Sequence, residues 1–313
     1  TVWDVASGEK VAEVKESVEG FDGVDGFAFS NDGTQLILMR KDLPLTYIDW
    51  KTGKAVKKLE IKADPKKILC HDFSDDQSLL VLGTMSNGIV VWDVKNGKKL
   101  KSFLPGQAIS GVDYITYKTK SGAVVRKIGW GRALMPPNAA WDNVAGIIDL
   151  DSGANATVLT DVPADKKPAD GSMTFLQANW QWGGGHLLIS YYQIPPKVKA
   201  GLFIIDAETK KYVTALELGQ KTLNFNPKYL WKPFYGLSIS TNDMSNPMQG
   251  YKSATEFVVW TKEGPKVIDS IDESKLPVQS INYNADNTLA VISQKKGMSD
   301  PATISIFKVS PKK

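Results

Sequence analysis

Few residues in this chain are of the types that carry catalysis or bind metals. Its 313 residues include one cysteine, Cys70, and two histidines, His71 and His186. The two histidines are far apart, and a zinc site needs three or four ligands at close spacing. The apolar context KILCHDF indicates that Cys70 is a buried, inert thiol. Nucleophile-elbow and phosphate-loop motifs are absent. The sequence therefore predicts no catalytic residue, no metal site and no cofactor.

The carboxylates with regular spacing are aspartates that end short apolar segments. These segments read VWD (2–4), YID (47–49), VVWD (90–93), GIID (146–149) and FIID (203–206). General acid–base chemistry needs two carboxylates close together, whereas consecutive members of this series are 45, 44, 56 and 57 positions apart. A turn pair such as Ser7-Gly8 or Asn96-Gly97 follows most of them. We therefore predict that each aspartate caps its own turn.

The segments around these aspartates read as β-strands. In the clearest unit, alternating strands at 25–29, 35–39, 46–50 and 55–61 are separated by turns at 30–33 and 51–53. Two more apolar strands, 256–261 and 304–308, continue the series without the aspartate. Four antiparallel strands that recur at about 44 residues, with no helical periodicity between them, are typical of a propeller blade.

Several segments resemble the WD-repeat pattern of β-propellers. They are FAFSNDGTQLIL, HDFSDDQSLLVLGTMSNGIVVWDVKNGKKLKSF and INYNADNTLAVIS, together with the strand endings VWDVASGEK, VVWDVKNGKK and IIDLDSG. The resemblance is strong over residues 1–105 and weak over 106–260. The Gly-His pair that often opens a family repeat is missing, so the usual His–Asp network is not expected here. The resemblance implies protein–protein interaction through one face and a central channel.

We predict an all-β chain that forms one domain, residues 1–313: a seven-bladed β-propeller of four-stranded antiparallel blades, with both terminal blades incomplete. The expected blades are 1–18 (partial), 22–62, 66–105, 108–161, 172–218, 220–272 and 277–311 (partial). An open ring would leave unpaired strand edges. We therefore expect that upstream residues or a partner strand complete the ring.

The amino-acid composition limits the classes of binding partner that are expected. The chain is 42% hydrophobic and 23% charged, with a net charge of +4 that comes mainly from lysine. Nucleic-acid readers depend on arginine, and only three are present, so no specific nucleic-acid partner is expected. No apolar run approaches the roughly 18 residues of a membrane span. We expect a soluble protein, cytoplasmic or exported, because the start TVWDVASGEK is not a signal peptide but the chain begins without Met.

Long loops are predicted at one face of the propeller. Connections from a second to a third strand, or from a fourth strand to the next blade, lie on the same face, and the long segments fall in this class: 133–143, 161–173, 194–200, 242–255 and 294–303. Long loops on a rigid scaffold commonly carry binding. Aromatic, Met and Arg residues favour interfaces. The candidate partner-binding residues are Trp130, Arg132, Trp141, Tyr191, Tyr192, Met244, Met248 and Tyr251. Alternatively, these loops fold down and bury their own aromatics.

The functional prediction is a non-enzymatic scaffold that binds other proteins, within a larger assembly, through the long loops of blades four to seven. One alternative is a propeller enzyme or electron-transfer subunit with a pocket at the channel mouth. Another is an exported binder of glycans or the cell envelope, which the nine tryptophans fit.

Overall fold

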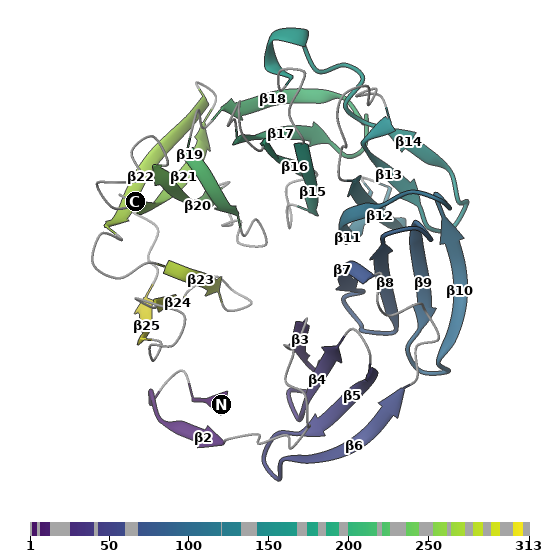
Figure 1. Cartoon of the computed structure of the whole chain (residues 1–313), viewed down its shortest axis with the longest axis vertical. Coiled ribbons are helices and arrows are strands. Elements are labelled where there is room, and N and C mark those ends of the chain that lie inside the picture. Colours follow the sequence, from purple (N-terminus) through teal and green to yellow (C-terminus); the bar gives the residue numbers. More distant parts are fainter. Residues whose placement is uncertain are drawn as a thin grey trace. The chain divides into compact units, whose positions relative to one another are not determined.

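The computed structural model describes most of the chain. The described residues are 2–4, 7–12, 26–40, 43–59, 68–119, 121–132, 143–167, 174–180, 186–193, 200–217, 221–225, 236–243, 253–261, 264–272, 278–283, 289–294 and 303–308. They form antiparallel sheets in two compact units, Thr1–Thr116 and Tyr117–Lys313 (Figure 1).

The first unit contains a two-stranded sheet, two four-stranded sheets and the start of a third. The two-stranded sheet pairs β1 with β2, and the next two have the orders β3-β4-β5-β6 and β7-β8-β9-β10. The strands are β1 (Val2–Trp3), β2 (Lys10–Ala12), β3 (Gly26–Phe29), β4 (Gln35–Arg40), β5 (Leu43–Asp49), β6 (Lys54–Leu59), β7 (Ile68–Phe73), β8 (Leu79–Thr84), β9 (Ile89–Asp93), β10 (Lys98–Phe103) and β11 (Ile109–Lys118), whose last residues belong to the second unit.

The second unit continues this plan. The orders β11-β12-β13-β14, β15-β16-β17-β18 and β19-β20-β21-β22 each make a four-stranded sheet, and β23-β24-β25 makes a three-stranded one. The strands are β12 (Val124–Arg132), β13 (Ala145–Asp149), β14 (Asn155–Thr157), β15 (Thr174–Trp180), β16 (His186–Gln193), β17 (Ala200–Asp206), β18 (Tyr212–Glu217), β19 (Lys221–Phe225), β20 (Gly236–Asp243), β21 (Ser253–Thr261), β22 (Gly264–Asp272), β23 (Val278–Tyr283), β24 (Leu289–Gln294) and β25 (Thr303–Lys308).

Each aspartate that ends a third strand caps the turn into the fourth strand, as the sequence predicts. Asp93 Oδ1 accepts the backbone N–H of Asn96 at 2.9 Å, and Asp149 Oδ1 accepts the N–H of Ser152 at 2.8 Å and its hydroxyl at 2.7 Å. The same bond recurs at the other turns of this class, with the acceptors Asp4, Asp49 and Asp206. Because these hydrogen bonds favour the ionised form, they lower the pKa of Asp93 and of Asp149.

Turns at 30–34 and 74–78, between first and second strands, are held by a second pattern of hydrogen bonds, and the turn at 74–78 also joins neighbouring sheets. In the turn after β7, Ser74 Oγ donates to Asp76 Oδ1 at 2.6 Å, and the N–H of Ser78 donates to the same oxygen at 3.0 Å. Gln77 takes up φ 56° there. Its side chain accepts the N–H of Asn31 at 2.9 Å and donates to the carbonyl of Phe29 at 2.6 Å. This turn therefore clamps the sheet β7–β10 to the sheet β3–β6.

The core lies between adjacent sheets. In the first unit, one buried cluster draws Ile37, Leu45 and Tyr47 from one sheet and Leu80, Leu82, Val90, Trp92 and Val94 from the next. In the second unit, buried Lys127 of β12 donates to the hydroxyl of Tyr117 at 2.8 Å and to the carbonyl of Ala207 at 3.2 Å. Its ammonium group is thereby satisfied while it links one four-stranded sheet to the next.

Most fourth strands share an irregularity that was not expected from the sequence. In five of the six pairings of a third with a fourth strand among the described residues, the register skips one fourth-strand residue, which is a β-bulge; the pairing of β13 with β14 is regular. The skipped residues are all apolar: Val11, Val56, Leu100, Val213 and Ile268. The first four are 49%, 53%, 49% and 49% exposed. A bulge interrupts the row of backbone groups on an outer strand, and it discourages pairing with another chain.

The expected shortfall of strands at the two terminal sheets is present among the described residues. They provide two strands for β1–β2 and three for β23–β25, where Ile304 and Ile306 of the last strand are 46% and 38% exposed. The seven-blade count, the blade boundaries and the mode of ring closure stay predictions. Among the described residues, no helix has the length and apolar character needed to cross a membrane.

The turn caps predict a specific pH dependence. Asp149→Asn keeps an acceptor oxygen but no charge. Because the pKa of Asp149 is lowered in the folded state, its charge stabilises the fold above the ordinary Asp pKa of about 4, and this contribution is lost as the pH falls through the lowered value. We expect the variant to lose about 1 kcal/mol or less of unfolding free energy at neutral pH, with the difference shrinking below about pH 5.

Urea unfolding from neutral pH to about pH 3 measures this difference. Glu208→Gln, at an exposed position of the turn after β17, is the matched control and should show no such trend. A difference between Asp149→Asn and wild type that stays constant with pH would contradict the role of the charge.

Candidate interaction surface

Connections of the two classes differ in length, as the strand order predicts. Successive connections of an antiparallel meander lie at opposite ends of the sheet. Those from third to fourth strand are short: 50–53, 94–97, 150–154 and 207–211. Those from second to third strand are short before Asp93, at 41–42 and 85–88, and longer after it, at 133–144, 194–199, 244–252 and 295–302. We call the sheet ends that carry this second class the loop-bearing ends.

One expectation is wrong in detail. All long segments predicted from the sequence belong to one class, but β19 ends at Phe225 and β20 begins at Gly236, so residues 226–235 connect a first strand to a second. A long connection therefore also leaves the opposite end of that sheet. The segment contains Pro227 and Pro233.

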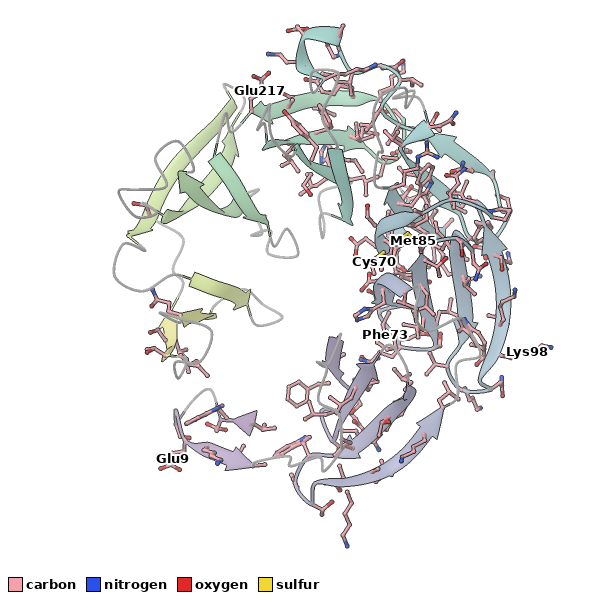
Figure 2. The ribbon with its side chains drawn as sticks, viewed as in Figure 1. Glu9, Cys70, Phe73, Met85, Lys98 and Glu217 are labelled. Atoms are coloured by element: carbon pink, nitrogen blue, oxygen red, sulfur yellow. The ribbon has the colours of Figure 1, made fainter. Side chains whose placement is uncertain are left out.

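The best-described part of the loop-bearing ends lies at β8–β11. The connection 85–88 and the connection 104–108 are bonded to each other: Gly88 N–H donates to the carbonyl of Gln107 at 3.2 Å, and Gly106 N–H donates to the carbonyl of Ser86 at 2.9 Å. The hydroxyl of Thr84 also donates to the carbonyl of Gly88 at 2.9 Å. These bonds make a fixed platform from which Met85, 51% exposed, projects (Figure 2).

Sequence reasoning did not select Met85, because its connection is short. The feature that could have identified Met85 is its residue type. An exposed methionine in a second-to-third-strand connection is an adaptable apolar contact. Beside it, the side-chain oxygen of Gln107 is enclosed and has no hydrogen-bond partner among the described residues.

Two of the predicted partner-binding aromatics are core residues. Trp130 is 1% exposed, and its Nε1 donates to Asn155 Oδ1 at 2.9 Å. Tyr191 is 2% exposed and stacks on Phe203 with ring centroids 4.8 Å apart. Both are enclosed because each lies on a second strand opposite a glycine of the third strand: Trp130 pairs with Gly146, and Tyr191 with Gly201. The aromatic ring covers the backbone that the glycine leaves bare.

These glycines are required by their neighbours. A methyl group on Gly201 would lie 2.5 Å from the Tyr191 ring, and one on Gly146 would lie 2.7 Å from Trp130 Nε1. The pairing was hidden in the sequence because the partners are 16 and 10 positions apart, and only the strand register shows which residues oppose each other. Trp130 and Tyr191 therefore shape the sheets that carry the loops.

Arg132 stands at the start of the longest second-to-third-strand connection. It ends β12, and its backbone N–H donates to the carbonyl of Val144 at 2.9 Å, which closes the base of the connection 133–144. The Nε of its guanidinium is enclosed and unpartnered among the described residues. A donor of this kind at the foot of a loop suits a carbonyl or carboxylate acceptor.

The other predicted contact residues fall where little is described. Trp141, Met244, Met248 and Tyr251 lie outside the described residues. Tyr192 belongs to β16, where its backbone pairs with Phe175 and Ala200, but its side chain is outside the described part. Their role in binding stays a prediction.

The connection from β14 to β15 shows that a long connection here can bury its own apolar residues. Val158, Leu159 and Val162 are 1%, 0% and 4% exposed. A 3₁₀ turn at Ala164–Lys166 follows, and Lys166 Nζ lies 3.0 Å from a carboxylate oxygen of Glu217 at the end of β18. The first part of this connection is thus a small satellite core, as the alternative interpretation of the loops proposes.

The ionisable groups of the described part include neighbouring aspartates and one cysteine. Burial and the charges of Asp72 and Asp76 raise the pKa of Asp75. No three or more His, Cys, Asp or Glu residues gather in the described part of the chain as metal ligands would. Cys70 Sγ lies 3.5 Å from the carbonyl of Ile109, and burial raises the pKa of its thiol to about 12. The thiol therefore stays protonated at neutral pH, in agreement with the prediction of an inert cysteine.

The positions of Trp130 and Met85 predict opposite effects of truncation. We expect Trp130→Ala to lower the unfolding free energy by about 3–5 kcal/mol, because it removes a fully enclosed ring and its hydrogen bond. Met85→Ala removes an exposed side chain, so a change within about 0.5 kcal/mol is expected. Denaturant unfolding of both variants measures this contrast, and equal losses would contradict the assignment of Trp130 to the core.

Comparison with known proteins identifies the fold. No family model matches the chain, and no curated protein matches its sequence. Among solved structures, hydrazine synthase of Kuenenia stuttgartiensis is similar with a TM-score of 0.59 and 12% identity, over 88% of this chain and 77% of that one. The β-propeller domain of Cps50 (Swd1) from Myceliophteria thermophila has a TM-score of 0.60 and 14% identity, over 91% and 83% of the two chains.

Identities this low show the fold alone. They agree with the repeated four-stranded antiparallel sheets and support the propeller part of the WD-repeat resemblance, while membership of that family stays a prediction. The chain is an all-β protein with the β-propeller fold.

Proposed function

We propose that this propeller is a non-enzymatic interaction scaffold that binds other proteins at its loop-bearing ends. The observation that carries the proposal is the contrast between the two classes of connection. Third-to-fourth-strand turns are short and held by an aspartate, whereas second-to-third-strand connections grow to 133–144 and 244–252. Binding sites commonly lie in loops of variable length on a rigid scaffold.

The proposed contact residues are Met85 and those residues predicted from the sequence that are not found in the core. They are Met85, Arg132, Trp141, Tyr192, Met244, Met248 and Tyr251, while the buried Trp130 and Tyr191 have a structural role in their sheets. Arg132 and Gln107 supply an unpartnered donor and an unpartnered acceptor among the described residues. Within each unit, apolar or aromatic residues and unsatisfied polar groups are of the types that interfaces favour.

An enzymatic function is the second candidate, because one similar structure is hydrazine synthase. Similarity at 12% identity shows only the fold, and a propeller carries many unrelated functions. An enzyme would need ionisable side chains that converge, and the described residues contain no group of three or more His, Cys, Asp and Glu that could hold a metal ion. The scaffold is therefore the function that the described site supports better.

Capture of partners from the native extract tests the proposal. We expect the protein to retain a defined set of partners, and we expect the double variant Trp141→Ala, Tyr192→Ala to lose them by about tenfold, equivalent to about 1.4 kcal/mol. Glu208→Ala, in the turn after β17 at the opposite end of its sheet, is the control and should retain them. Thermal melting of each variant checks that the fold is intact.

Two results would contradict the loop-bearing ends as the binding site. One is unchanged capture by the folded double variant, and the other is equal loss by Glu208→Ala. Defined turnover of a small molecule by the purified protein would instead favour the enzymatic candidate.

A further inference from the structure

Two neighbouring outer strands of the first unit form a strip that is rich in lysine. β6 (KAVKKL) and β10 (KKLKSF) are the fourth strands of adjacent sheets, and each carries three lysines and no carboxylate. All six lysines are exposed, and Figure 2 shows Lys98 extending away from its sheet. We call these two strands, with Lys95 of the turn before β10, the lysine strip.

The two strands belong to one continuous surface. The end of β6 meets the turn into β10, since a methyl group built on Gly97 would lie 2.8 Å from the Leu59 side chain. The Gln77–Asn31 bonds and the shared apolar cluster hold the two sheets in this arrangement. The strip is therefore a fixed feature of the first unit.

Two described carboxylates stand at the turn ends of the strip, and their hydrogen bonds favour the ionised form. Asp49 and Asp93 stand opposite Lys54 and Lys98 in the register, and each accepts turn N–H groups. Lys57, Lys58, Lys99 and Lys101 lie further along the strands. Lys57 Nζ is 5.1 Å from the centre of the Tyr47 ring, which is a cation–π contact that leaves its charge uncancelled. The strip thus presents a concentrated positive charge.

The positive charge is concentrated in the strip, because the first unit as a whole has no net positive charge. Residues 1–116 contain 15 Lys and Arg against 17 Asp and Glu, a net charge of −2. A broad anionic surface such as a membrane would meet Asp49 and Asp93 at the turn ends of β6 and β10 as well as the lysines. A narrow anionic chain would meet the lysines alone. The charge distribution therefore favours an extended chain over a surface.

The strip also contains exposed apolar residues, which select the kind of chain. The bulge residues Val56 and Leu100 are 53% and 49% exposed, and each has lysine on one or both sides. A nucleic-acid or sugar backbone would use the lysines and leave these side chains uncovered. A polypeptide that mixes Asp or Glu with apolar residues would use both. The bulges interrupt the outer row of backbone groups, so recognition would be by side chains.

We propose that the lysine strip of β6 and β10 binds an acidic, partly apolar, extended segment of a partner protein. This site is separate from the loop-bearing ends and does not depend on their role. Binding would weaken with salt, because exposed charges are screened over about 10 Å at 0.1 M ionic strength.

Fluorescence anisotropy with a labelled peptide of repeated Glu-Glu-Val units tests the proposal. We expect saturable binding to the wild-type protein and a loss of about tenfold or more in the variant Lys58→Glu, Lys99→Glu. The control Lys118→Glu, Lys211→Glu makes the same change of charge at exposed positions of the second unit and should bind within about twofold of wild type. Leu100→Ser should weaken this peptide but not poly-glutamate.

Equal losses in the strip variant and the control would overturn the proposal, since net charge alone would then explain binding. Tighter binding of duplex DNA or of phosphatidylserine vesicles than of the peptide would also overturn it and would assign the strip to that class of partner. Melting of each variant separates loss of binding from loss of fold.

Discussion

The structure depends on the packing of each sheet against its neighbour. A four-stranded sheet has two faces, and it cannot bury them by itself. The cluster of Ile37, Tyr47, Leu80 and Trp92 exists because two sheets supply its halves. Polar groups caught between sheets are satisfied across the same boundary, as Lys127 is by Tyr117 and Ala207. Stability is therefore shared between repeats, and each repeat must present a regular shape to the next.

This requirement explains why some connections keep a constant length and others vary in length. The turns capped by Asp93 and Asp149 keep the third and fourth strands in register, and a turn such as Ser74–Ser78 also binds the neighbouring sheet. They cannot lengthen without disturbing the packing. The extra residues after Asp93 fall mainly in the second-to-third-strand connections. Variation for binding thus accumulates at one end of the sheets, with residues 226–235 as the exception.

The outer strands face the opposite problem, because their free edges must not pair at random. A bulge at Val56 and at Leu100, with lysines beside it, interrupts each edge. In the first unit the same protection concentrates positive charge and exposed apolar side chains over two adjacent strands. A device that prevents unspecific pairing therefore also creates a surface with a definite chemical preference.

The amino-acid sequence alone determined the all-β fold, the repeated strands and the role of the aspartates, because these follow from local alternation and turn chemistry within a few residues. It also identified Cys70 as inert from its apolar neighbours. It could not show that Trp130 and Tyr191 are enclosed, because their partners Gly146 and Gly201 are set by strand register, and it did not reveal the bulges or the contact between Leu59 and Gly97. Those depend on which strands lie side by side, and only the tertiary structure decided that.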